Sequence, residues 1–180
     1  SNSYQQGFLA KYNSEGICQW AQFVADDSSV TTAFKIKVDS DGNLILAGEF
    51  YESTIHFNNN ISLNVNGQNN AYIAKYNSDG ICQWAQSVTG DSVNLLRDLD
   101  IDNDNNVYTL GLFMSDTIIF NNNKFLVNSE KYNPDGFLAK YNSDGICQWA
   151  ERIGGTNIDY TWYLAVENLE SGNKKTKSCE

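Results

Sequence analysis

The sequence is short of the residues on which several kinds of function depend. It contains a single histidine, His56, so a Ser-His-Asp or Cys-His relay would have to use that residue, and no nucleophile motif accompanies it. A similar segment recurs later in the sequence with Ile119 at the equivalent position, which indicates that His56 occupies an ordinary strand position. The shortage of histidine and the spacing of the cysteines exclude a zinc site of the usual type. We therefore predict no catalytic residue, and that the chain is not an enzyme.

Positive charge is also scarce, with 12 Lys and Arg against 22 Asp and Glu and a net charge of −10. Such a surface repels nucleic-acid phosphates and anionic membranes, so we expect no nucleic-acid partner. No stretch approaches the roughly 18 apolar residues of a membrane span. The chain opens on a polar run at residues 1–6 with no visible signal peptide; if the protein is exported, the signal has been removed or lies outside this sequence.

What the sequence does contain is repetition, the first feature to look for in an array protein. Residues 11–21 recur as 75–85 and 140–150, at intervals of about 64 residues. Two further blocks also recur: 39–48 matches 102–111, and 54–60 matches 117–123. The chain is therefore one repeat array.

Each repeat is predicted to form four strands, at 33–38, 44–50, 71–76 and 81–88 in the first full copy. The first alternates apolar and polar residues, and the second is apolar enough to be buried on both faces. The Asp-Gly pair at 79–80 is a strong hairpin signal between the last two strands. Residues 54–65 read as an extra hairpin with an Asn-rich tip, and no helical period appears anywhere.

Tandem four-stranded units must bury their faces against neighbouring copies, and the β-propeller does this radially. The predicted fold is all-β, with antiparallel blades of about 64 residues and about three blades in total, the first and last incomplete. Its divisions are a half-blade of outer strands at 7–30, full blades at 31–92 and 93–154, and a partial blade with a tail at 155–180. A β-solenoid is the competing architecture, but its repeats are far shorter.

Three features in order suggest a family. They are an apolar run followed by Lys-Tyr-Asn-x-Asp-Gly and Trp, an Asp-x-x-Gly-Asn turn before a strand that ends in Gly, and a Thr-Ile-x-Phe hairpin. This order resembles the bacterial β-propeller repeats called SBBP repeats, over nearly all of residues 7–166. The resemblance implies a secreted or cell-surface protein and supplies neither catalytic residues nor a general ligand. After Val166 the sequence departs from it, because the turn is longer and the lysines at 174–177 replace an apolar strand.

The acidic turns raise a calcium hypothesis, because they place oxygen donors at alternate positions, as in the first half of a calcium loop. The weak candidates are Asp39, Asp41, Asp100, Asp102 and Asp104. The glutamate required at the twelfth position is missing, since Phe50 and Phe113 stand there. We therefore favour turns in which Asp caps backbone amides, with no metal or cofactor.

The repeated cysteines Cys18, Cys82 and Cys147 occupy one equivalent position, so they would lie one blade apart, too far for a disulfide. We expect partly buried free thiols there. Cys179 lies outside the repeat and could pair with one of them, with a partner chain, or with nothing.

The repeated aromatic residues could line a sugar-binding face, as in propeller lectins, but core packing between blades is the favoured role because each buries a large apolar area. They are Trp20, Trp84, Trp149, Tyr12, Tyr76 and Tyr141. Asn60 begins a formal glycosylation sequon, Asn60-Ile61-Ser62, on the predicted hairpin tip.

Three functions are compatible with these features: a binding or scaffold module of a secreted or surface protein, a self-assembling unit, and a lectin. The predicted half-blades are complementary, so residues 7–22 of one copy could complete the blade begun by residues 160–166 of another, giving a ring or a filament. Alternatively, the chain is a fragment of a larger propeller adhesin. The expected partners are other copies or neighbouring repeats, with a glycan as a further candidate, and the expected location is extracellular or the cell surface.

Overall fold

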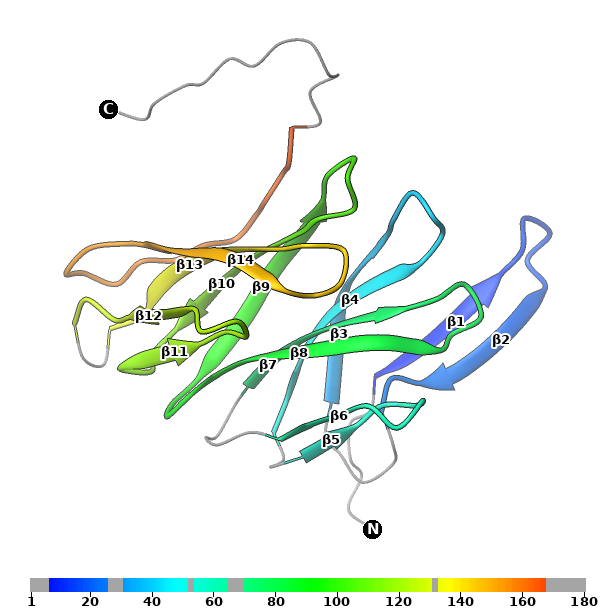
Figure 1. The fold of residues 1–180 in the computed structure, drawn as a ribbon, viewed down its shortest axis with the longest axis horizontal. Helices are drawn as coiled ribbons and strands as arrows, with labels where there is room; N and C mark the ends of the chain where they lie inside the picture. The colour runs from blue at the N-terminus through cyan, green and yellow to red at the C-terminus, as the bar shows by residue number, and fades with distance from the viewer. Residues whose placement is uncertain (1–6, 26–30, 52–53, 65–69, 131–132, 168–180) are drawn as a thin grey trace.

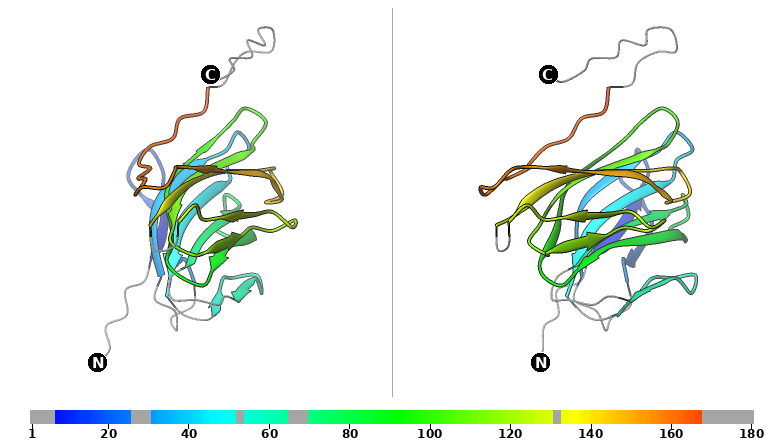
Figure 2. Two further views of the ribbon diagram at one scale, coloured as in Figure 1. Left: turned by 90° about the vertical axis from the view of Figure 1, so that its left-hand side faces the viewer. Right: turned by 60° about the vertical axis from the view of Figure 1, so that its left-hand side comes forward.

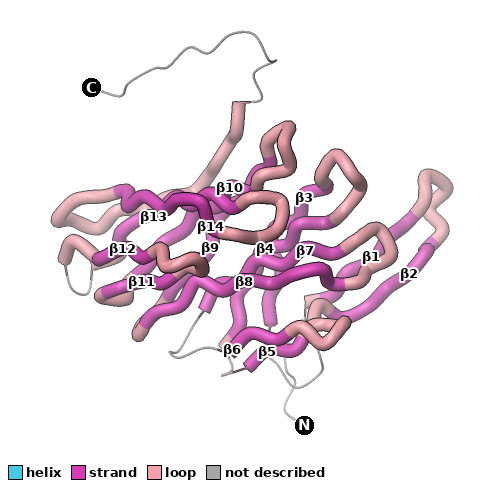
Figure 3. Tube along the Cα trace, viewed as in Figure 1, coloured by secondary structure: helices cyan, strands magenta, loops and turns pink. Residues whose placement is uncertain are grey.

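The computed structural model describes residues 7–25, 31–51, 54–64, 70–130 and 133–167, and every regular element within them is a β-strand (Figure 1, Figure 3). The strands are β1 (Phe8–Tyr12), β2 (Cys18–Phe23), β3 (Thr31–Val38), β4 (Leu44–Phe50), β5 (Thr54–His56), β6 (Ser62–Asn64), β7 (Asn70–Tyr76), β8 (Cys82–Gly90), β9 (Asn94–Ile101), β10 (Val107–Phe113), β11 (Thr117–Ile119), β12 (Phe125–Val127), β13 (Asp135–Tyr141) and β14 (Cys147–Ile153). The predicted all-β class is confirmed. Within these residues the structure has no helix with the length and apolarity needed to cross a membrane.

The strands pair as the repeat predicts. β3, β4, β7 and β8 lie side by side and antiparallel, and β9, β10, β13 and β14 form the same order one repeat later. β1 and β2 form a two-stranded sheet that matches the last two strands of each full sheet. Each repeat therefore builds one four-stranded blade, whose strand β4 or β10 is almost wholly buried because neighbours cover both its edges and both its faces.

The predicted extra hairpin is present as β5–β6, and again as β11–β12. Its Asn-rich tip caps the last turn of its own blade: the Cys82 amide donates to Asn58 Oδ1 at 2.7 Å, and the Cys147 amide donates to Asn121 Oδ1 at the same distance. Asparagine suits this tip because it tolerates the left-handed backbone that Asn60 adopts, with φ of 59°.

The sequence did not predict a second pairing of this hairpin. β11 pairs with β8 of the preceding blade, Ile118 opposite Gly90 and Ile119 opposite Thr89, so that sheet grows to six strands. Gly90 allows the close approach, because a Cβ there would lie 2.3 Å from Ser115 Oγ. The β11–β12 hairpin thus ties the two full blades together, whereas β5–β6 forms a separate two-stranded sheet.

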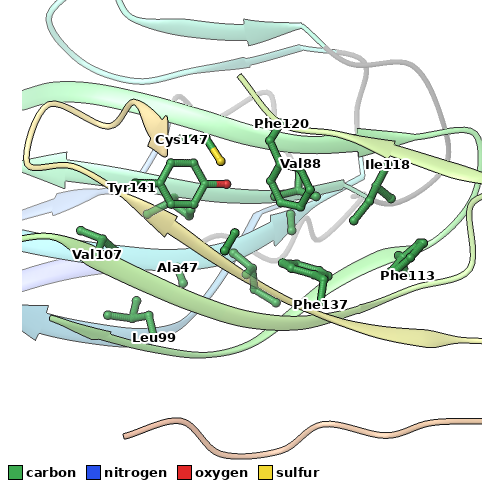
Figure 4. Close-up of a cluster of buried hydrophobic side chains, with 14 of the residues drawn as sticks. Ala47, Val88, Leu99, Val107, Phe113, Ile118, Phe120, Phe137, Tyr141 and Cys147 are labelled. Carbon is green, nitrogen blue, oxygen red and sulfur yellow. The ribbon is translucent and has the colours of Figure 1, made fainter. Parts of the chain in front are cut away.

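Two apolar cores lie between successive sheets, which stack face to face (Figure 2). One core lies between the two full blades and contains Phe113, Phe137 and Tyr141, with Val88 and Ile118 beside them (Figure 4). The other lies between the β1–β2 pair and the first full blade; its large members are Leu9, Val24, Phe50, Tyr72 and Tyr76. Packing between blades, rather than within one sheet, therefore buries the apolar surface.

Candidate interaction surface

The carboxylates of the acidic turns are bound by the protein itself. Asp39 Oδ1 accepts the backbone amides of Asp41 at 3.0 Å and Asn43 at 2.8 Å, and Asp39 Oδ2 lies 2.9 Å from Lys75 Nζ. Burial opposes ionisation of Asp39, but the hydrogen bonds from Asn43 and Lys75 outweigh it and hold the pKa of the carboxyl below its ordinary value. This is the capping role that the turn pattern favoured.

Asp102 repeats the arrangement, with the Asn106 amide at 2.9 Å and Lys140 Nζ at 3.4 Å. Burial again acts against ionisation, and the hydrogen bonds from Asn106 and Tyr108 again hold the pKa of Asp102 below its ordinary value. Lys140 also lies 4.9 Å from the ring centre of Tyr108. The lysine of the repeated Lys-Tyr-Asn block therefore serves to neutralise the turn aspartate of its own blade.

The other calcium candidates have separate surroundings, although Asp41 and Asp104 belong to the same two turns. Asp100 pairs with Lys37 of the preceding blade at 3.0 Å, Asp41 Oδ2 accepts from Asn105 Nδ2, and Asp104 is exposed. Across the described ranges no group of three or more His, Cys, Asp or Glu side chains could hold a metal ion. Calcium binding by these turns stays a prediction for a chelation experiment.

The repeated tryptophan fastens each blade to the next. The indole N–H of Trp20 donates to the carbonyl of Ser78 at 3.1 Å, and that of Trp84 donates to the carbonyl of Ser143 at 3.0 Å. The acceptor in each case lies in the Asn-Ser-Asp-Gly turn of the following blade. A glycine is required beside the ring, since a Cβ at Gly145, where φ is 76°, would lie 2.7 Å from Trp84. We call this contact the inter-blade clasp.

The repeated tyrosines fill the core, as favoured, with one exception. Tyr76 and Tyr141 are fully buried, and the Tyr76 hydroxyl donates to the carbonyl of Val24 at 2.8 Å. Tyr12 is 61% exposed. Two of the three repeated tyrosines are thus unavailable to a sugar, and the third lies on an open face.

The remaining candidate residues also have distinct surroundings. Cys18, Cys82 and Cys147 are free thiols. Burial raises the pKa of Cys82 to about 12 and that of Cys147 to about 11, whereas Cys18 is exposed. His56 and Asn60 are both exposed on the β5–β6 hairpin, and Cys179 lies outside the described residues.

One apolar exposed surface is the face of the β1–β2 pair directed away from β7. We call it the open blade face; its large side chains are Phe8, Tyr12, Ile17 and Phe23. Phe8 is 69% exposed, whereas its counterparts Tyr72 and Phe137 are fully buried by a neighbouring blade. No strand pairs with the free edge of β1 in the part of the chain that the structure describes. Such an edge beside exposed aromatic rings is a ready site for another chain.

A second surface lies on the innermost strands. Phe34, Arg97 and Trp162 occupy one equivalent position in three successive repeats, and they line a groove of about 390 Å³. Arg97 lies over the Trp162 ring at 5.6 Å. Burial raises the pKa of Glu49 at the edge of this groove, against the opposing charge of Arg97. Sequence reasoning missed these residues because the position carries a different residue type in each repeat.

No known protein-family profile matches the chain. Over 172 residues the chain is 25% identical to an uncharacterized WD repeat-containing protein of Acanthamoeba polyphaga mimivirus. The alignment covers 86% of this chain and 12% of the viral protein, so the chain spans only a small part of that relative's length. WD repeats are four-stranded propeller blades. The chain is a run of β-propeller blades. The comparisons give no support to the bacterial SBBP type in particular.

Proposed function

We propose that the chain is a non-catalytic binding scaffold, part of a secreted or cell-surface protein, which associates with other copies of itself through the open blade face. The observation that carries this proposal is the contrast between equivalent residues. Phe8 and Tyr12 are exposed, whereas the residues one repeat later are fully buried by a neighbouring blade. A blade-like partner would bury the same apolar area here.

The residues of the repeated block also argue against a catalytic role. In the described residues, Lys75 and Lys140 pair with turn aspartates, the tryptophans of two repeats fasten blades, and the buried cysteines have raised pKa values. Groups used in this way are not free for proton transfer or nucleophilic attack. WD repeat proteins, to which the chain is distantly similar, are commonly scaffolds, and this supports the same role.

Light scattering coupled to size exclusion tests the self-association. At micromolar concentration the 20.2 kDa chain should elute as a multiple of its mass and dissociate on dilution. Replacing Phe8 by Lys, at a position with little native burial, should yield a folded monomer. A wild-type chain that stays monomeric and soluble at these concentrations contradicts the proposal.

The location is a separate part of the proposal, supported by the resemblance to secreted repeat proteins. Asn60, exposed at a hairpin tip with Ser62 also exposed, offers a probe. Expression through a eukaryotic secretory pathway should add one glycan there, seen as a mobility shift that an endoglycosidase removes and Asn60→Gln abolishes. Failure of the chain to leave the cell would contradict export.

Glycan binding is the second candidate, and the groove on the innermost strands favours it. Trp162 is 59% exposed there, beside Phe34 and the charged Arg97, a combination that suits stacking and hydrogen bonding to a sugar. A glycan array should then give specific signals that disappear in Trp162→Ala. A blank array with folded protein would remove this candidate.

A further inference from the structure

We propose that the open blade face receives the outer strands β13 and β14 of a second copy, with Trp149 of that copy making the inter-blade clasp to the Ser14 carbonyl. The assembly is therefore head to tail. This inference rests on the proposed self-association and names the surface, the orientation and the residues that would carry it. The internal repeat of the chain supplies its geometry, because two interfaces of the same kind already exist within one copy.

The inter-blade clasp already occurs at both interfaces within one copy. Trp20 donates to Ser78 and Trp84 donates to Ser143, so in both existing interfaces the tryptophan of one blade reaches the turn of the next. Trp149 is the third tryptophan of the series, and its indole N–H has no acceptor among the described residues. Ser14 is the remaining serine of the series and lies in the exposed turn between β1 and β2. The Trp149 indole N–H and the Ser14 carbonyl make no clasp within the described residues, and they belong to the last and the first blade of the array.

At the Trp84 clasp a glycine stands beside the indole ring, whereas the equivalent Gly80 faces Gln22 of the preceding half-blade. Gly145 has φ of 76° and leaves room for the Trp84 ring, which a Cβ would approach within 2.7 Å. Gly16 has φ of 78°, but nothing within its own chain lies within 4 Å of a Cβ built there. Gly16 thus has the same left-handed backbone as Gly145, with open space beside it into which the Trp149 ring of a second copy would enter.

The outer face of β13–β14 and the open blade face both expose apolar side chains whose counterparts in the other repeats are buried. At the end of β14, Ile153 is 40% exposed, whereas its counterparts Val24 and Val88 are buried beneath the following blade. On the other side, Phe8 and Tyr12 are exposed where their counterparts are buried. Stacking β13–β14 of one copy on β1–β2 of another would bury both sets at once, as the existing interfaces do.

The chain also supplies a strand for the composite blade. Residues 160–166 run along the second full blade: Thr161 Oγ1 donates to the Gly111 carbonyl, the Leu164 amide to Asp98 Oδ2, and the Val166 amide to Asp100 Oδ2. These residues match β3 and β9 in the repeat, so they take the place of an innermost strand (Figure 1). Residues 160–166 of the second copy would provide the innermost strand of a single blade. β1 and β2 of the first copy would provide its two outer strands.

Such a contact joins different surfaces of two copies, so it either closes into a ring or grows into a filament. Two copies would give about six blades, within the usual range of closed propellers. The contact does not need a new kind of packing, since each element repeats one that the monomer already contains.

The test compares matched substitutions by sedimentation equilibrium and thermal melting. Trp149→Phe removes the clasp between copies and should weaken association about fivefold to tenfold, the worth of one hydrogen bond, without lowering the melting temperature of the dilute monomer. Trp84→Phe removes the same bond within one copy, so it should lower the melting temperature and leave association unchanged. Gly16→Ala should block association, because the added Cβ would meet the incoming Trp149.

The outcomes separate this inference from the proposed function. Weaker association in Trp149→Phe and Gly16→Ala, with folded monomers, supports the head-to-tail contact. Association equal to wild type in both variants overturns the contact but leaves self-association standing. A wild-type chain that does not associate overturns both.

Discussion

Tyr76 and Tyr141 stand at the same position of successive repeats, yet the same substitution should affect them in opposite ways. The Tyr76 hydroxyl donates to the Val24 carbonyl at 2.8 Å in a buried site. Tyr76→Phe therefore loses a hydrogen bond and leaves an acceptor unpaired, which costs about 1–3 kcal/mol. The Tyr141 hydroxyl is buried among Cys147 and its neighbours without a hydrogen-bond partner in the described structure (Figure 4). Tyr141→Phe removes an unpaired polar group and should be neutral or stabilising by up to about 1 kcal/mol.

Urea denaturation of both variants measures the difference, at concentrations where the chain is monomeric. With a slope near 2 kcal/mol per molar urea, a gap of about 2 kcal/mol separates the two midpoints by roughly 1 M. Equal slopes would show that the change lies in stability rather than in the denatured ensemble. Equal destabilisation in the two variants would refute the reasoning, because it would mean that the hydroxyl of Tyr141 is paired after all.

Four further measurements follow from the turns and the thiols. Asp39→Asn leaves the ammonium group of Lys75, whose side chain is 11% exposed, without its carboxylate partner. It should lower the free energy of unfolding by about 3–5 kcal/mol in urea denaturation. The loss should be smaller for Asp102→Asn, because its partner Lys140 is more exposed. Because the folded pKa of each aspartate is held below 3.8, its stabilisation is complete above that pH and is lost as the pH falls further, so melting temperatures should drop in acid, and less in Asp39→Asn. Thiol labelling followed by peptide mass spectrometry should modify Cys18 quickly in the native protein and Cys82 only after unfolding. A chelator should leave the melting temperature unchanged if the acidic turns bind no calcium.

The strands and turns could be predicted because they depend on local sequence. The apolar run at 44–50 is the strand β4 (Leu44–Phe50) as expected, and the last two strands were displaced by only one or two residues at their ends. The capping aspartates were also predictable, because Asp39 bonds amides two and four residues along the chain. The residues involved are neighbours, so their spacing carries the geometry.

Contacts between blades could not be predicted in the same way. The clasp from Trp84 ends on a backbone carbonyl, which leaves no signature in the sequence. The pairing of β11 with β8 is only two residues long and joins segments far apart in the chain. Tyr12 and Tyr76 sit in nearly identical sequence, yet one is exposed and the other buried, because burial depends on which blade lies next to each.

The differences between repeats indicate where a partner would be recognised. The residues that build a blade, such as Asn77 in the turn and Trp84 in the clasp, have identical counterparts in the other repeats and are used by the fold itself. The innermost strands differ: the position of Lys35 carries Asp98 in the next repeat, and the two pair at 3.2 Å between blades. A substitution there changes the charge along the inner surface without disturbing a turn or a clasp. The innermost strands differ in residue type between repeats, so a ligand that distinguished one repeat from another would contact these strands, whereas the proposed self-association uses the open blade face.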